Sequence, residues 1–339
     1  MKHKFKWTAG FAALLLASCS GPAETPTASE TPDETDQELA FSDGGATEIA
    51  DEQSEGDASE DTDADGLPGT DISISNLVWI DGSPRIADRI VVTSENLYDN
   101  QPAFDGNGGF YFTTETANGQ TDIHYLDLAS GSARAVTNTP DESEYSPRPS
   151  PDGASVTYIH QAPDGYGGQV FRNMLDGSST SPVHGYGPAG YYALAGDQSQ
   201  MLLFALTDPF SLRWVDLELG TEEEVTTGLG RALYSAPDGQ SAYFTLEHPE
   251  GGFIINQFSF ADASITPVFR LPGVTEDYAV FTNPDGELAW LAAFDGTLYY
   301  RATQSDWQPI DDLAAMGLTG ISRLAVSPDA SQLAIVAEE

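Results

Sequence analysis

Imidazole and carboxylate groups are the side chains of this sequence that could carry acid–base or metal chemistry. A metal site or an acid–base pair could be drawn from residues expected near one rim of the fold: His160, His248, Glu115, Asp208 and Asp295. No H-x-H or H-E-x-x-H spacing groups them into a familiar zinc motif. The sequence also lacks a G-x-S-x-G segment that could expose a nucleophilic serine. We therefore expect no catalytic residue, no metal and no cofactor in the folded part.

An aspartate-rich segment near the N-terminus matches the first half of a calcium-binding loop. Residues 61–66 read Asp-Thr-Asp-Ala-Asp-Gly, so Asp61, Asp63 and Asp65 would be the ligands. The twelfth position of such a loop holds a glutamate that binds through both oxygens, but here it is Ile72. A solvated run of charge is the simpler explanation of this pattern.

The first nineteen residues indicate where the protein resides. Three lysines precede an apolar stretch over residues 7–17, which is shorter than the roughly 20 residues that cross a bilayer and is typical of a cleaved secretory signal. The segment Leu16-Ala17-Ser18-Cys19 resembles the lipobox of bacterial lipoproteins, in which the cysteine is acylated and becomes the new N-terminus. The resemblance implies a signal peptide over residues 1–18 and a lipid anchor on Cys19. An ordinary signal peptide with a chance cysteine is the alternative. Because Ser20 is not the aspartate that retains lipoproteins at the inner membrane, the outer membrane is favoured.

Acidic residues outnumber basic ones along the whole chain. There are 53 Asp and Glu against 13 Lys and Arg, which gives a formal net charge of −40. Such a surface repels phosphate backbones and anionic lipids, so nucleic acid is excluded as a partner and the membrane is reached only through the anchor. Residues 19–71 are acidic and poor in large apolar side chains, which predicts a disordered linker that holds a folded body away from the membrane.

Turns of the Pro-Asp-Gly type recur along residues 72–339. Their aspartates are 47, 45, 41, 47 and 44 residues apart, and they are Asp105, Asp152, Asp197, Asp238, Asp285 and Asp329. Each turn is followed by a strongly apolar strand, and no helical period is sustained. A period of this length, made of four short strands, is typical of a β-propeller. Six turns predict an all-β domain of six blades.

The two ends of this region each supply half of a blade. The last repeat contributes two strands before Glu339, and two predicted strands at residues 75–80 and 89–93 precede the first repeat. Together they would form one four-stranded sheet, which closes the ring and removes its open edges.

The repeats resemble the WD40-like repeats of TolB-type six-bladed propellers, with a core of the form D-x-x-P-x-(W/F)-S-P-D-G. Residues 137–153 read Thr-Asn-Thr-Pro-Asp-Glu-Ser-Glu-Tyr-Ser-Pro-Arg-Pro-Ser-Pro-Asp-Gly, and residues 324–330 read Leu-Ala-Val-Ser-Pro-Asp-Ala. The third turn, Gly196-Asp197-Gln198, departs from the pattern. The resemblance implies a scaffold shared by proteins of many functions and no particular reaction. TolB also carries an N-terminal α/β domain that meets the other Tol proteins. Since an acidic linker takes its place here, a role in the Tol system is not implied.

Aromatic and charged side chains recur about seven residues before the turn aspartates, where the innermost strands begin. We expect them around the mouth of the central channel, opposite the turns: Tyr98, Asp99, Tyr145, Tyr191, Arg231, Asp277, Tyr278 and Arg323. Tyr and Arg dominate binding hot spots, so these residues could bind a peptide or polar ligand. Alternatively, the tyrosines simply pack between blades.

These features predict a lipid-anchored, extracytoplasmic propeller in a bacterial cell envelope. It would act as a non-enzymatic scaffold that binds a protein, a peptide or another ligand. A propeller hydrolase or lyase with its active site in the central channel is the alternative.

Replacing Cys19 with serine should release the protein from bacterial membranes, because a hydroxyl cannot take the place of sulfur in the acylation. Membrane fractionation followed by circular dichroism of the released protein would check both its location and its folding. A C19S variant that still sediments with membranes would contradict the predicted anchor.

Overall fold

The computed structural model describes residues 69–93, 97–163, 166–183, 185 and 187–338. The chain divides into two units, Met1–Ser59 and Glu60–Glu339, and every described residue belongs to the second. Cys19, the signal peptide, nearly all of the acidic linker and the calcium candidates Asp61, Asp63 and Asp65 lie outside the described residues. In the part of the chain that the structure describes, no helix has the length and apolarity needed to span a membrane.

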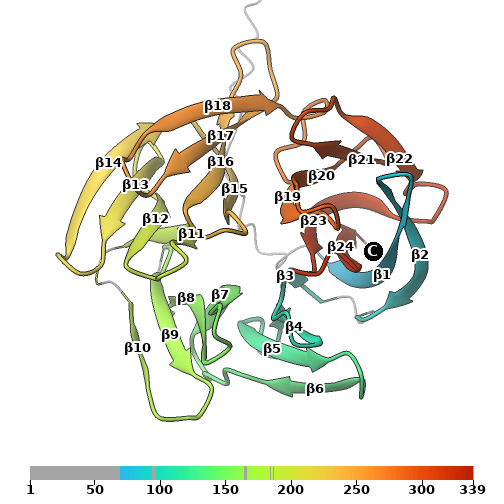
Figure 1. The fold of residues 1–339 in the computed structure, drawn as a ribbon. Helices are drawn as coiled ribbons and strands as arrows, with labels where there is room; N and C mark the ends of the chain where they lie inside the picture. Colours follow the sequence, from blue (N-terminus) through green and yellow to red (C-terminus); the bar gives the residue numbers. More distant parts are fainter. Residues whose placement is uncertain (1–68, 94–96, 164–165, 184, 186, 339) are drawn as a thin grey trace, which may run out of the picture. The chain divides into compact units, whose positions relative to one another are not determined.

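The described residues form six four-stranded antiparallel sheets arranged as the blades of a ring (Figure 1). Five blades use consecutive strands in the orders β3–β6, β7–β10, β11–β14, β15–β18 and β19–β22, and we number them one to five. Blade six has the order β23-β24-β1-β2. The predicted all-β fold, its six blades and its closure by the N-terminal strands are confirmed.

In each blade the four strands lie side by side, and their order leads outward from the axis of the ring. The innermost strands are β3 (Asp99–Phe104), β7 (Ser143–Pro149), β11 (Ala189–Leu194), β15 (Leu229–Ser235), β19 (Ala279–Thr282) and β23 (Thr319–Val326). The second strands are β4 (Gly109–Glu115), β8 (Ser155–Gln161), β12 (Gln200–Ala205), β16 (Ser241–Glu247), β20 (Leu288–Phe294) and β24 (Gln332–Glu338). The third strands are β5 (Thr121–Asp127), β9 (Gln169–Met174), β13 (Ser211–Asp216), β17 (Phe253–Ser259), β21 (Thr297–Ala302) and β1 (Thr70–Ile80). The outer strands are β6 (Ser132–Ala135), β10 (Thr180–Pro182), β14 (Thr221–Thr227), β18 (Ile265–Arg270), β22 (Gln308–Asp312) and β2 (Ser83–Val91).

The second strand of each blade is strongly buried. Each of the six buries five consecutive residues. Because neighbouring side chains of a strand point to opposite faces of the sheet, both faces must be covered by adjacent blades. The outer strands β6 and β10 are exposed along their whole length. This gradient explains why the segment after each turn is so apolar in the sequence.

The turns between the first two strands are held by their aspartates. In blade two, Asp152 Oδ1 accepts hydrogen bonds from the Ser150 hydroxyl at 2.6 Å and from the Ala154 amide at 3.0 Å. Gly153 follows with a positive φ of 68°, a conformation that glycine adopts without strain. The unusual turn of blade three has a physical reason, because the Gly196 amide donates to the Gly239 carbonyl of blade four at 2.9 Å. Proline, which has no N–H, could not make this bond between blades.

The N-terminal strands close the ring by pairing with the C-terminal strand. β1 runs antiparallel to β24 with Ile72 opposite Val336, and β2 pairs with the outer side of β1. The strand boundaries differ from the prediction, which placed strands at 75–80 and 89–93. The two strands are instead joined by a tight turn at Asp81 and Gly82, both with positive φ. A two-residue Asp-Gly turn of this kind matches the twist of a hairpin. The chain therefore reverses at once, and the residues after the turn pair with β1 as the outer strand β2.

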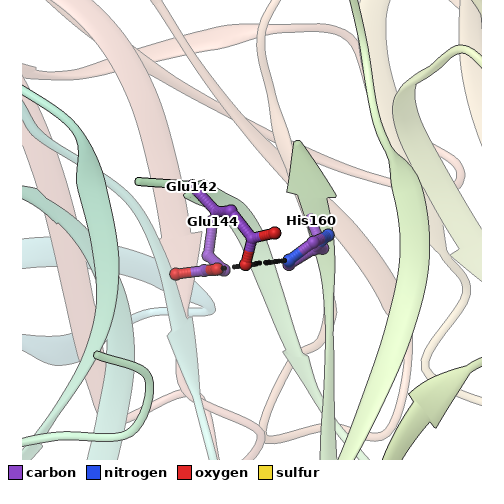
Figure 2. A group of neighbouring side chains, drawn as sticks. All are labelled: Glu142, Glu144 and His160. Carbon is purple, nitrogen blue, oxygen red and sulfur yellow. Dashed lines mark hydrogen bonds and ion pairs between the residues drawn. The ribbon is translucent and has the colours of Figure 1, made fainter. Parts of the chain in front are cut away.

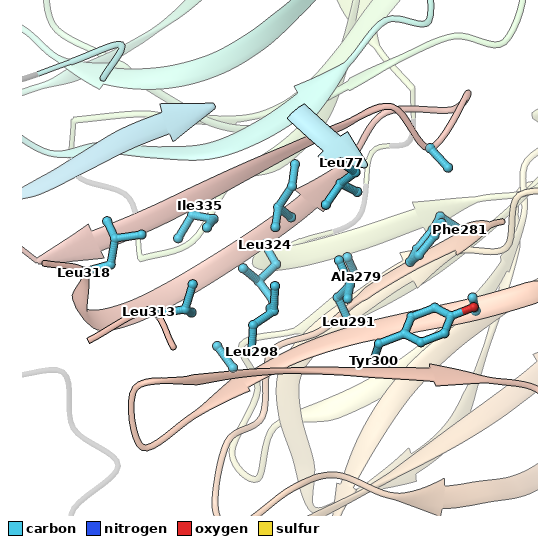
Figure 3. Close-up of a cluster of buried hydrophobic side chains, with 14 of the residues drawn as sticks. Leu77, Ala279, Phe281, Leu291, Leu298, Tyr300, Leu313, Leu318, Leu324 and Ile335 are labelled. Carbon is cyan, nitrogen blue, oxygen red and sulfur yellow. The ribbon is translucent and has the colours of Figure 1, made fainter. Parts of the chain in front are cut away.

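The closing strand β1 contributes to two hydrophobic clusters. Leu77 packs with Leu291, Leu298, Leu324 and Ile335 in a cluster that joins blades five and six (Figure 3). Toward blade one, Ile72 and Ile74 pack against Phe110 and Phe112 of β4. The N-terminal strand is therefore part of the core on both sides of its blade.

Ile72→Ala should lower the free energy of unfolding by about 2–5 kcal/mol, because Ile72 is fully buried and its removal leaves a cavity between blades six and one. Ile90→Ala on β2 is the matched control, since Ile90 is 66% exposed and its replacement should change stability by less than about 0.5 kcal/mol. Urea denaturation would measure both. Equal losses would contradict a core role for the closing strand.

Candidate functional site

A cavity of about 530 Å³ lies at the centre of the ring. Residues of all six innermost strands line it, together with several of the turns. Three of the ten arginines in the sequence face this cavity: Arg148, Arg231 and Arg323. Among the described lining residues, Asp238 is the only carboxylate and there is no histidine. Small and aliphatic residues make up most of the lining, and its charged groups are mainly cationic.

Bulges in the innermost strands help to aim side chains into the channel. The pairing register shifts between Tyr145 and Arg148 in β7, and similar shifts occur in β3, β11, β15 and β23. A bulge inserts an extra residue and re-directs the side chains next to it. In β3 and β7 the bulges hold Gln101 and Ser146 at positive φ, and the Ser146 amide donates to Gln101 Oε1 at 2.7 Å. This bond ties blade one to blade two beside the cavity.

A polar network centred on Arg323 crosses the channel. Arg323 donates to Asp277 Oδ1 at 3.3 Å and to the Tyr191 hydroxyl at 3.1 Å, and its guanidinium lies 5.1 Å from the centre of the Tyr191 ring. Asp277 also accepts from the Leu324 amide at 2.9 Å and from the hydroxyl of Tyr234. The network joins blades three, four, five and six. Because blades three and six are opposite in a six-membered ring, the Arg323–Tyr191 contact spans the channel.

Burial shapes the protonation of this network. It raises the pKa of the Asp277 carboxyl, while the Arg323 guanidinium and the hydrogen bonds from Tyr234 and Leu324 oppose that rise. Burial and the neighbouring Asp277 carboxylate also raise the pKa of Tyr234, which keeps its proton and acts as a donor. Asp277 is therefore an acceptor for three donors and is not a free base.

Arg148 also lines the cavity. Its guanidinium lies 5.2 Å from the centre of the Tyr234 ring, within the range of a cation–π contact. Among the described residues it has no ion pair with a carboxylate. Arg231, in contrast, has its Nε 4.0 Å from Glu276 Oε1.

The structure brings together only part of the predicted channel-mouth set. Tyr191, Arg231 and Arg323 line the cavity, and Asp277 lies behind Arg323. The other four predicted residues do not line it: Tyr98, Asp99, Tyr145 and Tyr278.

Those four residues contact neighbouring strands instead. Tyr278 is fully buried with its ring 5.2 Å from that of Tyr234, and Tyr145 packs against the cluster that contains Ile159. The carbonyl of the buried Asp99 accepts a hydrogen bond from the Thr70 hydroxyl of β1. Tyr98 forms an isolated β-bridge with Thr70. Tyr145 and Tyr278 thus pack between blades, which was the alternative to a role in ligand binding.

Among the polar cavity residues that sequence reasoning missed are Gln101, Arg148 and Tyr234. Each lies four residues before a turn aspartate, whereas the prediction used the position seven residues before it. A comparison of the repeats at that second position would have found them.

The rim candidates do not form one site. No hydrogen bond or ion pair joins any two of Glu115, His160, Asp208, His248 and Asp295 among the described residues. His160 instead meets two glutamates that the sequence analysis did not consider, Glu142 and Glu144 (Figure 2). Ligand atoms of these three side chains lie within 4.8 Å of one another, so they could hold a metal ion.

The protonation of Glu144 reflects its position between blades. Burial raises the pKa of the Glu144 carboxyl to about 7, and the nearby Asp122 adds to the rise, while the hydroxyls of Thr139 and Thr137 oppose it.

Neither a protein-family model nor a curated protein sequence matches the chain. Several solved structures resemble it. A protein of Agrobacterium tumefaciens described as a TolB superposes with a TM-score of 0.58 at 18% identity, over 81% of this chain and 99% of that one. TolB from Acinetobacter baumannii gives a TM-score of 0.50 at 11% identity, over 80% of this chain and 64% of that one. A chain of a nidogen/laminin complex gives 0.54 at 10% identity, over 79% and 98%.

At these identities the similarity establishes the fold alone. The chain has the six-bladed propeller fold of TolB-type proteins, as its repeats predicted.

Asp277→Ala should lower the free energy of unfolding by up to about 3 kcal/mol, because Arg323 would keep a largely buried charge without its carboxylate partner. Asp306→Ala is the matched control, since Asp306 is fully exposed beside Arg301 and its loss should leave stability unchanged. Thermal or urea denaturation would compare the two. An Asp277→Ala protein as stable as the control would contradict the structural role of the network.

Proposed function

We propose that this protein is a lipid-anchored, extracytoplasmic binding protein of a bacterial cell envelope, and that its central channel receives an acidic peptide segment of a protein partner. The lipid anchor rests on the leader over residues 1–18 and on Cys19. The binding role rests on the cavity.

The observation that carries the proposal is the placement of arginine in a strongly acidic chain. The sequence has a net charge of −40, yet three of its ten arginines line one cavity. Arg323 is paired with Asp277 and Arg231 lies near Glu276, so Arg148 supplies the positive charge that is left to attract a carboxylate-bearing segment. Arginine binds carboxylates through a planar fork of donors, and Tyr191 and Tyr234 add amphipathic contact area.

Binding explains the channel better than catalysis does. A hydrolase or lyase needs a positioned acid, base or nucleophile near the substrate. Asp238 is the single carboxylate among the described lining residues, and Asp277 is already bonded to Arg323, Tyr234 and the Leu324 amide. The cavity volume of about 530 Å³ suits a few residues of an inserted segment.

Arg148→Ala should weaken peptide binding about 10- to 100-fold, because it removes charge-assisted hydrogen bonds inside the channel. The measurement is selection of displayed random peptides on the purified protein, followed by fluorescence anisotropy of the enriched sequences. We expect peptides rich in Asp and Glu, whose binding weakens as salt is raised.

Arg134→Ala is the matched control for this experiment. Arg134 also lies over a tyrosine ring, 4.9 Å from the centre of Tyr125, but it is on the outer strand β6 and does not line the cavity. Its replacement should leave affinity unchanged. Enrichment of basic peptides, or equal affinity of the Arg148 and Arg134 variants, would overturn the proposal.

A further inference from the structure

A compact group of one imidazole and two carboxylates lies at the junction of blades one and two. His160 Nε2 is 2.9 Å from Glu142 Oε2 and 3.9 Å from Glu144 Oε1 (Figure 2). The three ligand atoms all lie within 4.8 Å of one another, so small movements of the side chains would place them around one ion. None of the three residues lines the central cavity, so this group is separate from the proposed peptide site.

The hairpin of blade two fixes these side chains on one face. Glu144 on β7 is directly opposite His160 on β8 in the antiparallel register. Glu142 lies just before β7, and its carboxylate contacts the same imidazole. The His160 ring packs against Phe171 with 4.5 Å between ring centres, which fixes the plane of the imidazole.

A supporting set of hydrogen bonds holds Glu144 in place. Thr139 donates from its hydroxyl to Glu144 Oε1 at 2.7 Å, and the Thr121 hydroxyl of blade one donates to the Glu144 carbonyl at 3.0 Å. Partners of this kind orient metal ligands in proteins and strengthen binding.

The burial of Glu144 points to a missing cationic partner. Glu144 is fully buried, and its second carboxylate oxygen, Oε2, has no hydrogen-bond partner among the described residues. Asp122, which is also buried, adds negative charge nearby. His160 is the one basic side chain with an ion pair to Glu144 in the described part of the chain. Glu144 Oε1 is the oxygen that faces His160. Two buried carboxyl groups without a matching cation are unfavourable, and a cation bound at Oε1 would offset their negative charge.

The pairing of a carboxylate with an imidazole does not recur in blade four. In blade four, the corresponding innermost and second strands pair Leu229 with Leu246, which cannot bind a metal. The imidazole and carboxylates are therefore not a general feature of the repeat.

We propose that Glu142, Glu144 and His160 form a binding site for a divalent first-row transition metal ion, Mn²⁺ or Zn²⁺. An imidazole nitrogen favours such ions over Ca²⁺ and Mg²⁺, and two carboxylates complete a three-ligand set with positions left for water. The ion joins the segment before β7 to the end of β8. Because Thr139 and Thr121 contact the same residues, it also stabilises the junction of blades one and two.

The test uses the full chain produced without a histidine tag, stripped with EDTA and titrated with Mn²⁺ or Zn²⁺ by isothermal titration calorimetry. We expect a single site in the wild type and a rise in melting temperature on addition of the metal. His160→Gln and Glu142→Gln should each weaken binding at least tenfold, roughly the scale on which metal sites respond to altered ligands and supports, and should abolish the rise. His248→Gln, which removes a half-buried imidazole at the rim of blade four, is the matched control and should behave as the wild type.

A spectroscopic measurement on the wild type keeps the test independent of variant folding. Pulsed electron paramagnetic resonance of the Mn²⁺ complex should show coupling to an imidazole nitrogen, which the His248→Gln protein retains. Absence of nitrogen coupling would overturn the proposal. So would affinity unchanged by His160→Gln, or Ca²⁺ binding equal to Mn²⁺ binding, since both indicate adventitious binding to acidic surface only. Peptide binding in the channel need not change in any of these outcomes, so the two proposals fail separately.

Discussion

The pairing of β1 with β24 is the interaction on which the rest of the structure depends. A propeller blade is buried only if both neighbours are present, and the sixth blade exists only because two strands from the start of the folded region complete it. β1 then supplies Ile72 to the interface with blade one and Leu77 to the interface with blade five. The central cavity is a product of this closure, because its lining comes from all six innermost strands and loses its shape if one blade is displaced.

The fold was predictable because its turns leave a direct mark on the sequence. Proline, aspartate and glycine each meet a separate need of the same tight turn, so their spacing gives the number of blades. β2 was misplaced because its polar residues pair only at an exposed outer edge, where no apolar pattern is required. Gly196 departs from the repeat pattern, yet its amide donates a backbone hydrogen bond to Gly239 of the next blade. Contacts between blades of this kind cannot be inferred from one repeat alone.

The candidate sites were less predictable than the fold, for two different reasons. Which side chains reach the channel depends on bulges that shift the register within the innermost strands, and bulges have no reliable signal in a single sequence. Arg148 was therefore missed while Tyr145 was favoured. The meeting of Glu144 and His160 was in principle accessible, because both lie eight residues from Asp152 at the tip of their hairpin. A search for motifs that are local in sequence does not detect ligands that face each other across a turn.

The six repeats give the ring an approximate sixfold rotational symmetry, but its charges do not share that symmetry. Arg323 is neutralised by Asp277 and Arg231 lies near Glu276, whereas the guanidinium of Arg148 rests on an aromatic ring. A segment bound in the channel would thus contact six similar innermost strands, and Arg148 of blade two would be the arginine without a carboxylate partner among the described residues. Shape alone would leave its rotation about the axis undetermined. A cation without a carboxylate partner among the described residues would favour one rotation of a bound segment about the axis, so charge would break a symmetry that shape leaves intact.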